Sequence, residues 1–204
     1  QIVSCGEILS TKIISAYLNH DGVDNTFLDI RSELVTDDHY QEAKICWNDT
    51  EINFNKCFSF ENTKIYITQG FIGGTKNNKS TTLGREGSDY TAAIIANILG
   101  AESVTVWKDV PGLLNADPKW FDNTVRLSNI SYKEAIELAY YGATVIHPKT
   151  LKPLENKNIP LYVRSFVNPD ASGSRIDKNT SEDSKIPSFI FRVNQVLISI
   201  AARD

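Results

Sequence analysis

One stretch decides how this chain folds: Thr81-Thr82-Leu83-Gly84-Arg85-Glu86-Gly87-Ser88-Asp89-Tyr90-Thr91-Ala92-Ala93. A polar turn with two glycines leads directly into an apolar run, residues 92–99, which stops at Gly100. This pattern predicts a loop followed by a helix, with Ser88 or Asp89 as the N-cap and Gly100 as the C-terminal cap. Because the run is apolar on almost every face, we expect the helix to be buried.

The start of this predicted helix carries groups that suit a zwitterionic ligand. A helix N-terminus attracts anions, and Gly84 and Gly87 allow the backbone to approach a ligand closely. Arg85 offers a guanidinium group to a carboxylate or phosphate, and Asp89 offers a carboxylate to an ammonium group. The same residues fit a second interpretation equally well: a capped, buried helix with an ordinary surface ion pair between Arg85 and Asp89.

Composition excludes several classes of protein. The chain has 204 residues, of which 41% are apolar and 23% charged, as is ordinary for a globular protein. The net charge of −4 gives no electrostatic basis for binding nucleic acid or an anionic membrane. No apolar run approaches the roughly 20 residues that a membrane helix needs. We therefore expect neither a nucleic-acid partner nor a membrane partner.

The cysteine and histidine residues give no sign of a metal site. Cys5, Cys46 and Cys57 have neither a disulfide framework nor a zinc-binding spacing, and the three histidines are scattered. We expect reduced thiols in a cytoplasmic protein, with Cys5 buried as a small apolar residue.

Outside the deciding stretch, the hydrophobic pattern alternates between strands and helices, which is typical of an α/β fold. Further helices are expected at residues 7–19, 131–141 and 150–158, the second with a capping box formed by Ser131 and Glu134. Strands are expected at 2–4 (the end of a strand), 26–30, 64–68, 103–107 and 159–164. Residues 40–60 fit either a helix or a mixture of helix and extended chain, and 76–80 form a polar loop.

Several motifs, in order, resemble those of the aspartokinases in the amino acid kinase family. The stretch 81–93 is similar to their aspartate-binding signature. The other matching motifs are Ser4-Cys5-Gly6-Glu7-Ile8-Leu9-Ser10, Ile67-Thr68-Gln69-Gly70-Phe71-Ile72-Gly73, Trp107-Lys108-Asp109-Val110-Pro111-Gly112, Ala116-Asp117-Pro118-Lys119 and Gly142-Ala143-Thr144-Val145-Ile146-His147-Pro148. The resemblance covers nearly the whole chain.

The resemblance implies a three-layer α/β/α sandwich with a mostly parallel sheet. Residues 1–168 would form the C-terminal majority of the catalytic domain, 169–188 a polar linker, and 189–204 the start of a ferredoxin-like ACT domain. The chain has no methionine and begins at Gln1, after the point where the family has a Lys-Phe-Gly-Gly-Thr-Ser loop. We therefore expect an internal fragment that is inactive, or nearly so, by itself.

The function implied is that of an aspartate kinase, which transfers the γ-phosphate of ATP to the β-carboxylate of L-aspartate. The product, 4-phospho-L-aspartate, begins the synthesis of lysine, threonine and methionine. Mg²⁺ is expected, held mainly through phosphate oxygens. The family forms homodimers or larger assemblies through ACT domains, which the resemblance extends to this protein.

The resemblance also assigns roles to residues. Asp89 would be catalytic, orienting a lysine and the substrate amino group. Aspartate would contact Glu7, Arg85, Gly87, Ser88 and Asp89. ATP would contact Lys108, Asp109, Gly112, Leu114, Lys119, Thr144 and Val145.

Some of these residues admit a simpler interpretation. A carboxylate at Glu7 is favourable at a helix N-terminus by charge alone. Asp109 fits a turn as well as it fits ribose hydroxyls. His147 is expected to be a packed, hydrogen-bonded residue rather than a base.

Two of the positions at which the nucleotide motifs differ from the family pattern, Thr144 and Lys108, look exchanged. Many relatives have lysine at the position of Thr144 and threonine at that of Lys108. We hypothesise that Lys108 supplies the positive charge that position 144 lacks. The alternative is that Lys108 faces solvent.

Three other functions remain open at this point. The first is a kinase for a different substrate, such as glutamate, acetylglutamate or UMP. The second is a non-catalytic regulatory or binding piece, and the third is a generic α/β nucleotide-binding domain.

Overall fold

The computed structural model describes residues 2–61, 63–141, 145–178, 186–190 and 196. The helices are α1 (Ile2–His20), α2 (Ile30–Glu33), α3 (Trp47–Cys57), α4 (Gly87–Leu99), α5 (Tyr132–Tyr141) and α6 (Pro148–Lys157). The strands are β1 (Thr26–Leu28), β2 (Val35–Thr36), β3 (Tyr66–Thr68), β4 (Ile72–Thr75), β5 (Ser80–Thr82), β6 (Val104–Lys108), β7 (Asn129–Ser131), β8 (Leu161–Ser165) and β9 (Ser174–Asp177).

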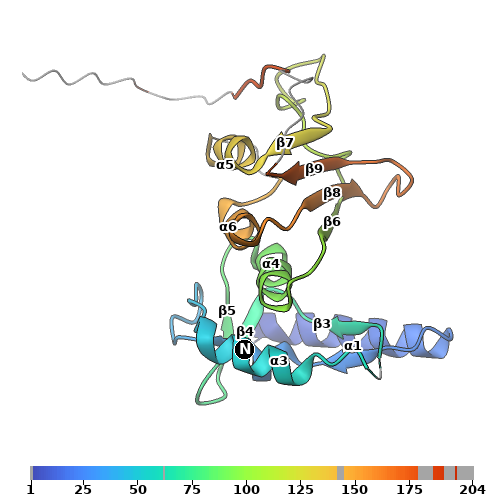
Figure 1. Ribbon diagram of the computed structural model, residues 1–204, viewed down its shortest axis with the longest axis vertical. Helices are drawn as coiled ribbons and strands as arrows, with labels where there is room; N and C mark the ends of the chain where they lie inside the picture. The colour runs from blue at the N-terminus through green and yellow to red at the C-terminus, as the bar shows by residue number, and fades with distance from the viewer. Residues whose placement is uncertain (1, 62, 142–144, 179–185, 191–195, 197–204) are drawn as a thin grey trace, which may run out of the picture.

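Among the described residues, the strands form three small sheets, ordered β1-β3, β2-β4-β5 and β6-β8-β9-β7. Pairing is parallel except between β4 and β5 and between β8 and β9. Helices α5 and α6 lie along one side of the four-stranded sheet (Figure 1). The α/β class with mostly parallel pairing, predicted from the sequence, is confirmed.

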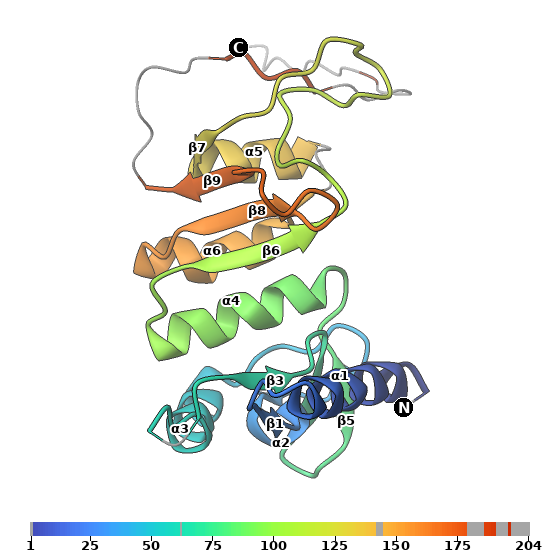
Figure 2. The ribbon, with the colours of Figure 1, turned by 90° about the vertical axis from the view of Figure 1, so that its right-hand side faces the viewer.

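Helix α4 joins the two halves of the molecule. It crosses between the four-stranded sheet and the layer that contains α1, α3 and the smaller sheets (Figure 2). Ala93 and Ala96 pack into the core under the four-stranded sheet, whereas Tyr90 and Ile94 pack into the core around α2, α3 and β4. A helix that is apolar on every face is stable only where both sides are covered, so the predicted burial of α4 is confirmed.

The cap of α4 differs from the prediction. The helix begins at Gly87, and the N-cap is Glu86, whose φ of 53° is left-handed and whose side chain makes no capping hydrogen bond. Gly87 fits tightly: an added Cβ would lie 2.8 Å from Cδ2 of Phe71. Ser88 and Asp89 are therefore inside the first turn rather than at the cap. Gly100 ends the helix with a φ of 64°, as predicted.

The chain start is helical rather than the end of a strand. Helix α1 runs from Ile2 through Gly6, although the sequence suggested a strand at 2–4 and a helix from about residue 7. Ile2 is 90% exposed and pairs with no strand among the described residues, so no strand pairing stabilises an extended backbone there. Glu7 consequently lies in the second turn, and the prediction that it sits at a helix N-terminus is wrong.

A strand lies within the polar segment predicted as linker. Residues Ser174–Asp177 form β9, which is inserted between β8 and β7. Ser174 and Ile176 are completely buried, while Arg175 and Asp177 form an ion pair of 2.6 Å. Buried and exposed residues alternate along these four positions, as in a strand. The pattern is too short to stand out among the polar residues on either side. Of residues 189–204, predicted to begin an ACT domain, the structure describes only Phe189, Ile190 and Val196.

The other sequence expectations were met to different degrees. Strands β1, β3, β6 and β8 and helices α5 and α6 lie within a few residues of their predicted positions, although Ile30 begins α2 rather than ending β1. The ambiguous segment contains α3. Residues 76–79 connect β4 to β5, and Ser80, predicted as part of the loop, instead begins β5.

The three cysteines, all of them described, form no disulfide. Cys5 is exposed, which contradicts the expectation that it is buried. Burial, and to a smaller degree the charge of Glu33, raise the pKa of the Cys57 thiol to about 11. No helix in the described part of the chain is both long and apolar enough to cross a membrane.

The predicted capping box of α5 is confirmed. The backbone N–H of Glu134 donates to Oγ of Ser131 at 3.1 Å, and the N–H of Ser131 donates to Oε2 of Glu134 at 2.9 Å. We expect Ser131→Ala to lower the free energy of unfolding by about 1 kcal/mol, because one helix donor loses its acceptor. Urea denaturation measures this, with Ser128→Ala as a control on an exposed loop residue. A loss equal to that of the control would contradict the capping role.

Candidate active site

The start of α4 and the end of β6 are joined by an ion pair. Nζ of Lys108, the last residue of β6, lies 2.6 Å from Oδ2 of Asp89 in the first turn of α4. The side chains are 27% and 15% exposed, so this pair is better shielded from water than an ordinary surface pair. It brings together two residues predicted for different substrates, Asp89 for aspartate and Lys108 for the nucleotide.

Arg85 projects from the same loop and is exposed. No ion pair or hydrogen bond of its guanidinium group is found among the described residues. The interpretation of Arg85 and Asp89 as a surface ion pair is therefore wrong, since the carboxylate pairs with Lys108 instead. The guanidinium group is left available for a carboxylate or phosphate. Ser88, also predicted for substrate binding, is exposed beside it.

Close packing fixes the first turn of α4 against residues 70–71. A Cβ on Gly70 would lie 2.8 Å from Cα of Ser88, so only glycine permits this contact without a shift. Next to it, Phe71 has a φ of 70°, and the N–H of Ile72 donates to the carbonyl of Gly70 at 2.8 Å, which defines a strained γ-turn. Strain of this kind persists where the surrounding structure holds it in place, often near functional sites.

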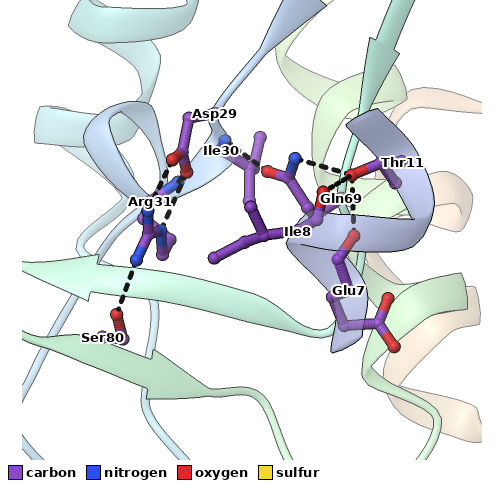
Figure 3. Close-up of polar contacts among 8 residues, drawn as sticks. All are labelled: Glu7, Ile8, Thr11, Asp29, Ile30, Arg31, Gln69 and Ser80. Carbon is purple, nitrogen blue, oxygen red and sulfur yellow. Dashed lines mark hydrogen bonds and ion pairs between the residues drawn. The ribbon is translucent and has the colours of Figure 1, made fainter. Parts of the chain in front are cut away.

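Glu7 lies on α1, whereas the other residues predicted to bind aspartate lie at 85–89, in and before the first turn of α4. It is half-buried, and its carbonyl accepts a 2.7 Å hydrogen bond from Oγ1 of Thr11. Thr11 belongs to a polar cluster that includes Gln69, Asp29 and Arg31 (Figure 3). The hydrogen bonds from Arg31 hold the pKa of the Asp29 carboxyl below its usual value.

A cavity of about 260 Å³ follows the end of β6. Four residues predicted for the nucleotide line it, namely Gly112, Leu114, Lys119 and Val145. Its wall also includes Val110, two residues after Lys108, and Phe189. The mixture of apolar walls and a lysine at the rim suits a planar, charged ligand. Lys108 and the exposed Asp109 are not among the lining residues, and Thr144 lies outside the described part of the chain.

Asn115 and Ser174 shape this cavity, although no sequence pattern singled them out as functional residues. Asn115 is 7% exposed; its Oδ1 accepts from the N–H of Val125, and its Nδ2 donates to the carbonyl of Pro187 at 3.1 Å. Oγ of Ser174 accepts from the N–H of Leu113 at 2.8 Å. Asn115 directly precedes the motif that begins at Ala116, which could have drawn attention to it, but Ser174 is distant in sequence and carried no signal.

His147 caps α6, and Lys149 in its first turn supports the loop before α4. His147 is the N-cap of α6 and accepts from the N–H of Lys149, so the prediction of a hydrogen-bonded histidine is confirmed. Nζ of Lys149 donates to the carbonyl of Leu83 at 3.0 Å and lies 4.9 Å from the centre of the Tyr90 ring. Lys149 thereby anchors the deciding stretch, a role that the sequence did not indicate.

No group of three side chains that could hold a metal ion occurs in the parts of the chain that the structure describes. Near the site, the best-placed carboxylate, that of Asp89, is already engaged by Lys108. The described residues therefore offer no all-protein cage for a cation.

Comparison with known proteins identifies the family. The amino acid kinase family model matches residues 1–165. The chain is 35% identical over 201 residues to lysine-sensitive aspartokinase 3 of Escherichia coli, covering 98% of this chain and 45% of that protein. It is also 35% identical to the chloroplastic bifunctional aspartokinase/homoserine dehydrogenase 2 of Zea mays, covering 98% of this chain and 22% of that protein.

Solved structures agree with this result. E. coli aspartokinase III in complex with aspartate and ADP superimposes with a TM-score of 0.84 at 36% identity, over 88% of this chain and 40% of that one. UMP kinase from Ureaplasma parvum shares the fold alone, with a TM-score of 0.59 at 18% identity over 85% of this chain and 68% of that one.

The chain therefore belongs to the amino acid kinase family. The two curated relatives named above are an aspartokinase and an aspartokinase fused to a homoserine dehydrogenase. The chain spans less than half the length of these two curated relatives.

Proposed function

We propose that this chain is part of an aspartate kinase, which transfers the γ-phosphate of ATP to the β-carboxylate of L-aspartate. The observation that carries the proposal is the ion pair of 2.6 Å between Asp89 and Lys108. It joins the loop of the aspartokinase-like signature to the strand that leads into the cavity. Two substrates bound on either side of this pair would be held close enough to react.

In this proposal, Arg85, Ser88, Gly87 and Glu7 bind L-aspartate. The guanidinium group of Arg85 donates hydrogen bonds to a substrate carboxylate, and the N–H groups at the start of α4 add a favourable dipole. Asp89 holds the substrate ammonium group and orients Lys108. Gly112, Leu114, Lys119, Thr144 and Val145 bind ATP, with Asp109 near the ribose.

During transfer, an oxygen of the β-carboxylate attacks the γ-phosphorus while the bond from phosphorus to the ADP oxygen breaks. Charge collects on the transferring phosphoryl group, so Lys108 acts by neutralising that charge. Mg²⁺ bound through the ATP phosphates fits a site without an all-protein cage among the described residues and would neutralise further charge.

We also propose a cytoplasmic protein that assembles as a homodimer or larger through ACT domains. Composition favours reduced thiols, and the relatives that match are longer than this chain. The linker predicted at 169–188, apart from strand β9 within it, and 189–204 as the start of an ACT domain belong to this proposal.

The deciding test is ADP release by the full-length protein, measured with ATP and either L-aspartate or L-glutamate. We expect turnover with aspartate and none above background with glutamate. Turnover with another acceptor, such as acetylglutamate or UMP, would show that this member of the amino acid kinase family acts on a different substrate. Binding of ATP without turnover of any of these acceptors would favour a regulatory or generic nucleotide-binding role.

Lys108→Thr tests whether Lys108 supplies the charge expected at position 144. We expect kcat to fall and the KM for ATP to rise, together lowering kcat/KM for ATP by about tenfold. The reason is that a cation is lost next to the transferring phosphoryl group. If both constants stay within about twofold, a shift under about 0.5 kcal/mol, the hypothesis is wrong. Lys152→Thr, at an exposed lysine paired with Glu155 on α6, is the matched control.

A further inference from the structure

The side chain of Gln69 is completely buried. It follows β3, and both ends of its side-chain amide are engaged. Oε1 accepts from the N–H of Ile30 at 2.9 Å, and Nε2 donates to Oγ1 of Thr11 at 2.8 Å (Figure 3). A buried amide that is bonded at both ends fixes the elements that it connects, because leaving either group unpaired is costly.

The second of these contacts continues to Glu7. A threonine hydroxyl has one proton, so when Oγ1 of Thr11 accepts from Gln69 it still has that proton to donate. It donates to the carbonyl of Glu7 at 2.7 Å, with the carbonyl of Ile8 at 3.2 Å. The amide of Gln69 thus holds the turn of α1 that carries Glu7 (Figure 3).

Apolar packing holds α1 at few positions, one of which is Ile8, which packs against the core around α2, α3 and β4. Every residue of α1 is described by the structure, and the fully buried ones are Ser4 and Ser15. Leu9 is 60% exposed and Ile13 is 67% exposed. The polar contact between Gln69 and Thr11 therefore acts together with the packing of Ile8 to place the turn that carries Glu7.

The residues after Gln69 make contacts with α4 instead. Gly70 packs directly on Ser88, where an added Cβ would lie 2.8 Å from Cα. The N–H of Phe71 donates to Oγ1 of Thr91 at 3.0 Å. Three consecutive residues therefore connect α1 to the first two turns of α4. These are the two helices that carry the predicted aspartate-binding groups.

We infer that Gln69 is a positioning residue for the acceptor substrate: through Thr11 it sets the place of Glu7 relative to Ser88 and Asp89. This inference rests on the proposed function, because it takes Glu7 to bind L-aspartate. The effect is on acceptor binding. The cavity for the nucleotide lies beyond β6 and shares no residue with this cluster.

A simpler role for Gln69 is to satisfy the N–H of Ile30 at the start of α2, and the two roles are separable at Thr11. Thr11→Val removes the hydroxyl group with little change in volume and leaves the bond between Gln69 and Ile30 in place. Thr11→Ser keeps the hydroxyl group and serves as the conservative rescue. Ser15→Ala is the matched control, because it removes the 2.6 Å hydrogen bond from Ser15 to Asn25, one turn further along α1.

The experiment measures kcat and the KM values for L-aspartate and ATP in the full-length protein. We expect Thr11→Val to raise the KM for aspartate about tenfold and to leave the KM for ATP within about twofold. Thr11→Ser and Ser15→Ala should stay within about twofold of wild type in both constants. Thermal unfolding identifies any variant that has lost its fold, in which case Thr11→Ala replaces Thr11→Val.

Glu7→Gln, measured alongside, separates this inference from the proposed function. If Glu7→Gln raises the KM for aspartate but Thr11→Val does not, the positioning role is overturned while the proposed function stands. An equal rise in the KM values for aspartate and ATP in Thr11→Val would also overturn it, since that pattern indicates general disruption. Absence of aspartate-dependent turnover in the wild type would overturn the proposed function and this inference with it.

Discussion

Asp89→Asn in the full-length protein is expected to lower kcat by about 100- to 1,000-fold, or roughly 3–4 kcal/mol of transition-state stabilisation. The substitution keeps the size of the side chain but removes the charge that lies 2.6 Å from Nζ of Lys108. A largely shielded lysine without its carboxylate loses its orientation, and the substrate ammonium group loses its counter-charge. Steady-state ADP release with saturating ATP and aspartate measures the effect.

A surface ion pair provides the control. Lys152 and Glu155 on α6 lie 2.9 Å apart, but their side chains are 63% and 35% exposed. Glu155→Gln should therefore change kcat by less than about twofold, since exposed pairs contribute little. A kcat for Asp89→Asn within about tenfold of wild type, with the protein folded, would show that Asp89 has no catalytic role.

Gly112→Ala is expected to weaken ATP binding at least tenfold and to lower the free energy of unfolding by roughly 2–4 kcal/mol. Gly112 has a φ of 137°, which side chains rarely adopt, and an added Cβ would lie 2.5 Å from Oγ of Ser174. That oxygen accepts the hydrogen bond from Leu113, so the methyl group would displace the loop that lines the cavity. Titration with ATP and denaturation in urea measure the two effects.

Substitution of a second glycine distinguishes the cost of backbone strain from the cost of the steric clash with Ser174. Gly100 also has a positive φ, 64°, but a Cβ added there would meet no atom within 4 Å outside its own neighbours in the chain. Gly100→Ala should cost about 1 kcal/mol from backbone conformation alone and should leave ATP binding unchanged. If Gly112→Ala costs no more than Gly100→Ala, the contact with Ser174 does not shape the nucleotide loop.

The features that could be predicted correctly are local ones. The capping box of Ser131 and Glu134 depends on residues three positions apart, and the cap at Gly100 depends on its own backbone freedom. The apolar run of α4 indicated burial on both sides, which the two cores confirm. The motifs around Arg85 and Asp89 were sufficient to place the chain in its family.

Predictions from the sequence were wrong where a contact with a residue distant in the chain overrode a local preference. Asp89 has a good capping side chain, yet its carboxylate is bound by Lys108, 19 positions away. The polar segment that contains Ser174 looked like a linker, yet it supplies a strand because Ile176 fits the core between β8 and β7. In both cases a contact between distant residues outweighed the local preference.

The family, the α/β class and the C-terminal cap of α4 follow from the amino-acid sequence alone, because they depend on neighbours along the chain. The pairing of Asp89 with Lys108 rather than Arg85 is apparent only in the folded molecule, as is the link that Gln69 makes between Ile30 and Thr11 across 39 and 58 positions. Such contacts form because buried polar groups must find partners, and the nearest available partner in space is set by the packing of the whole chain.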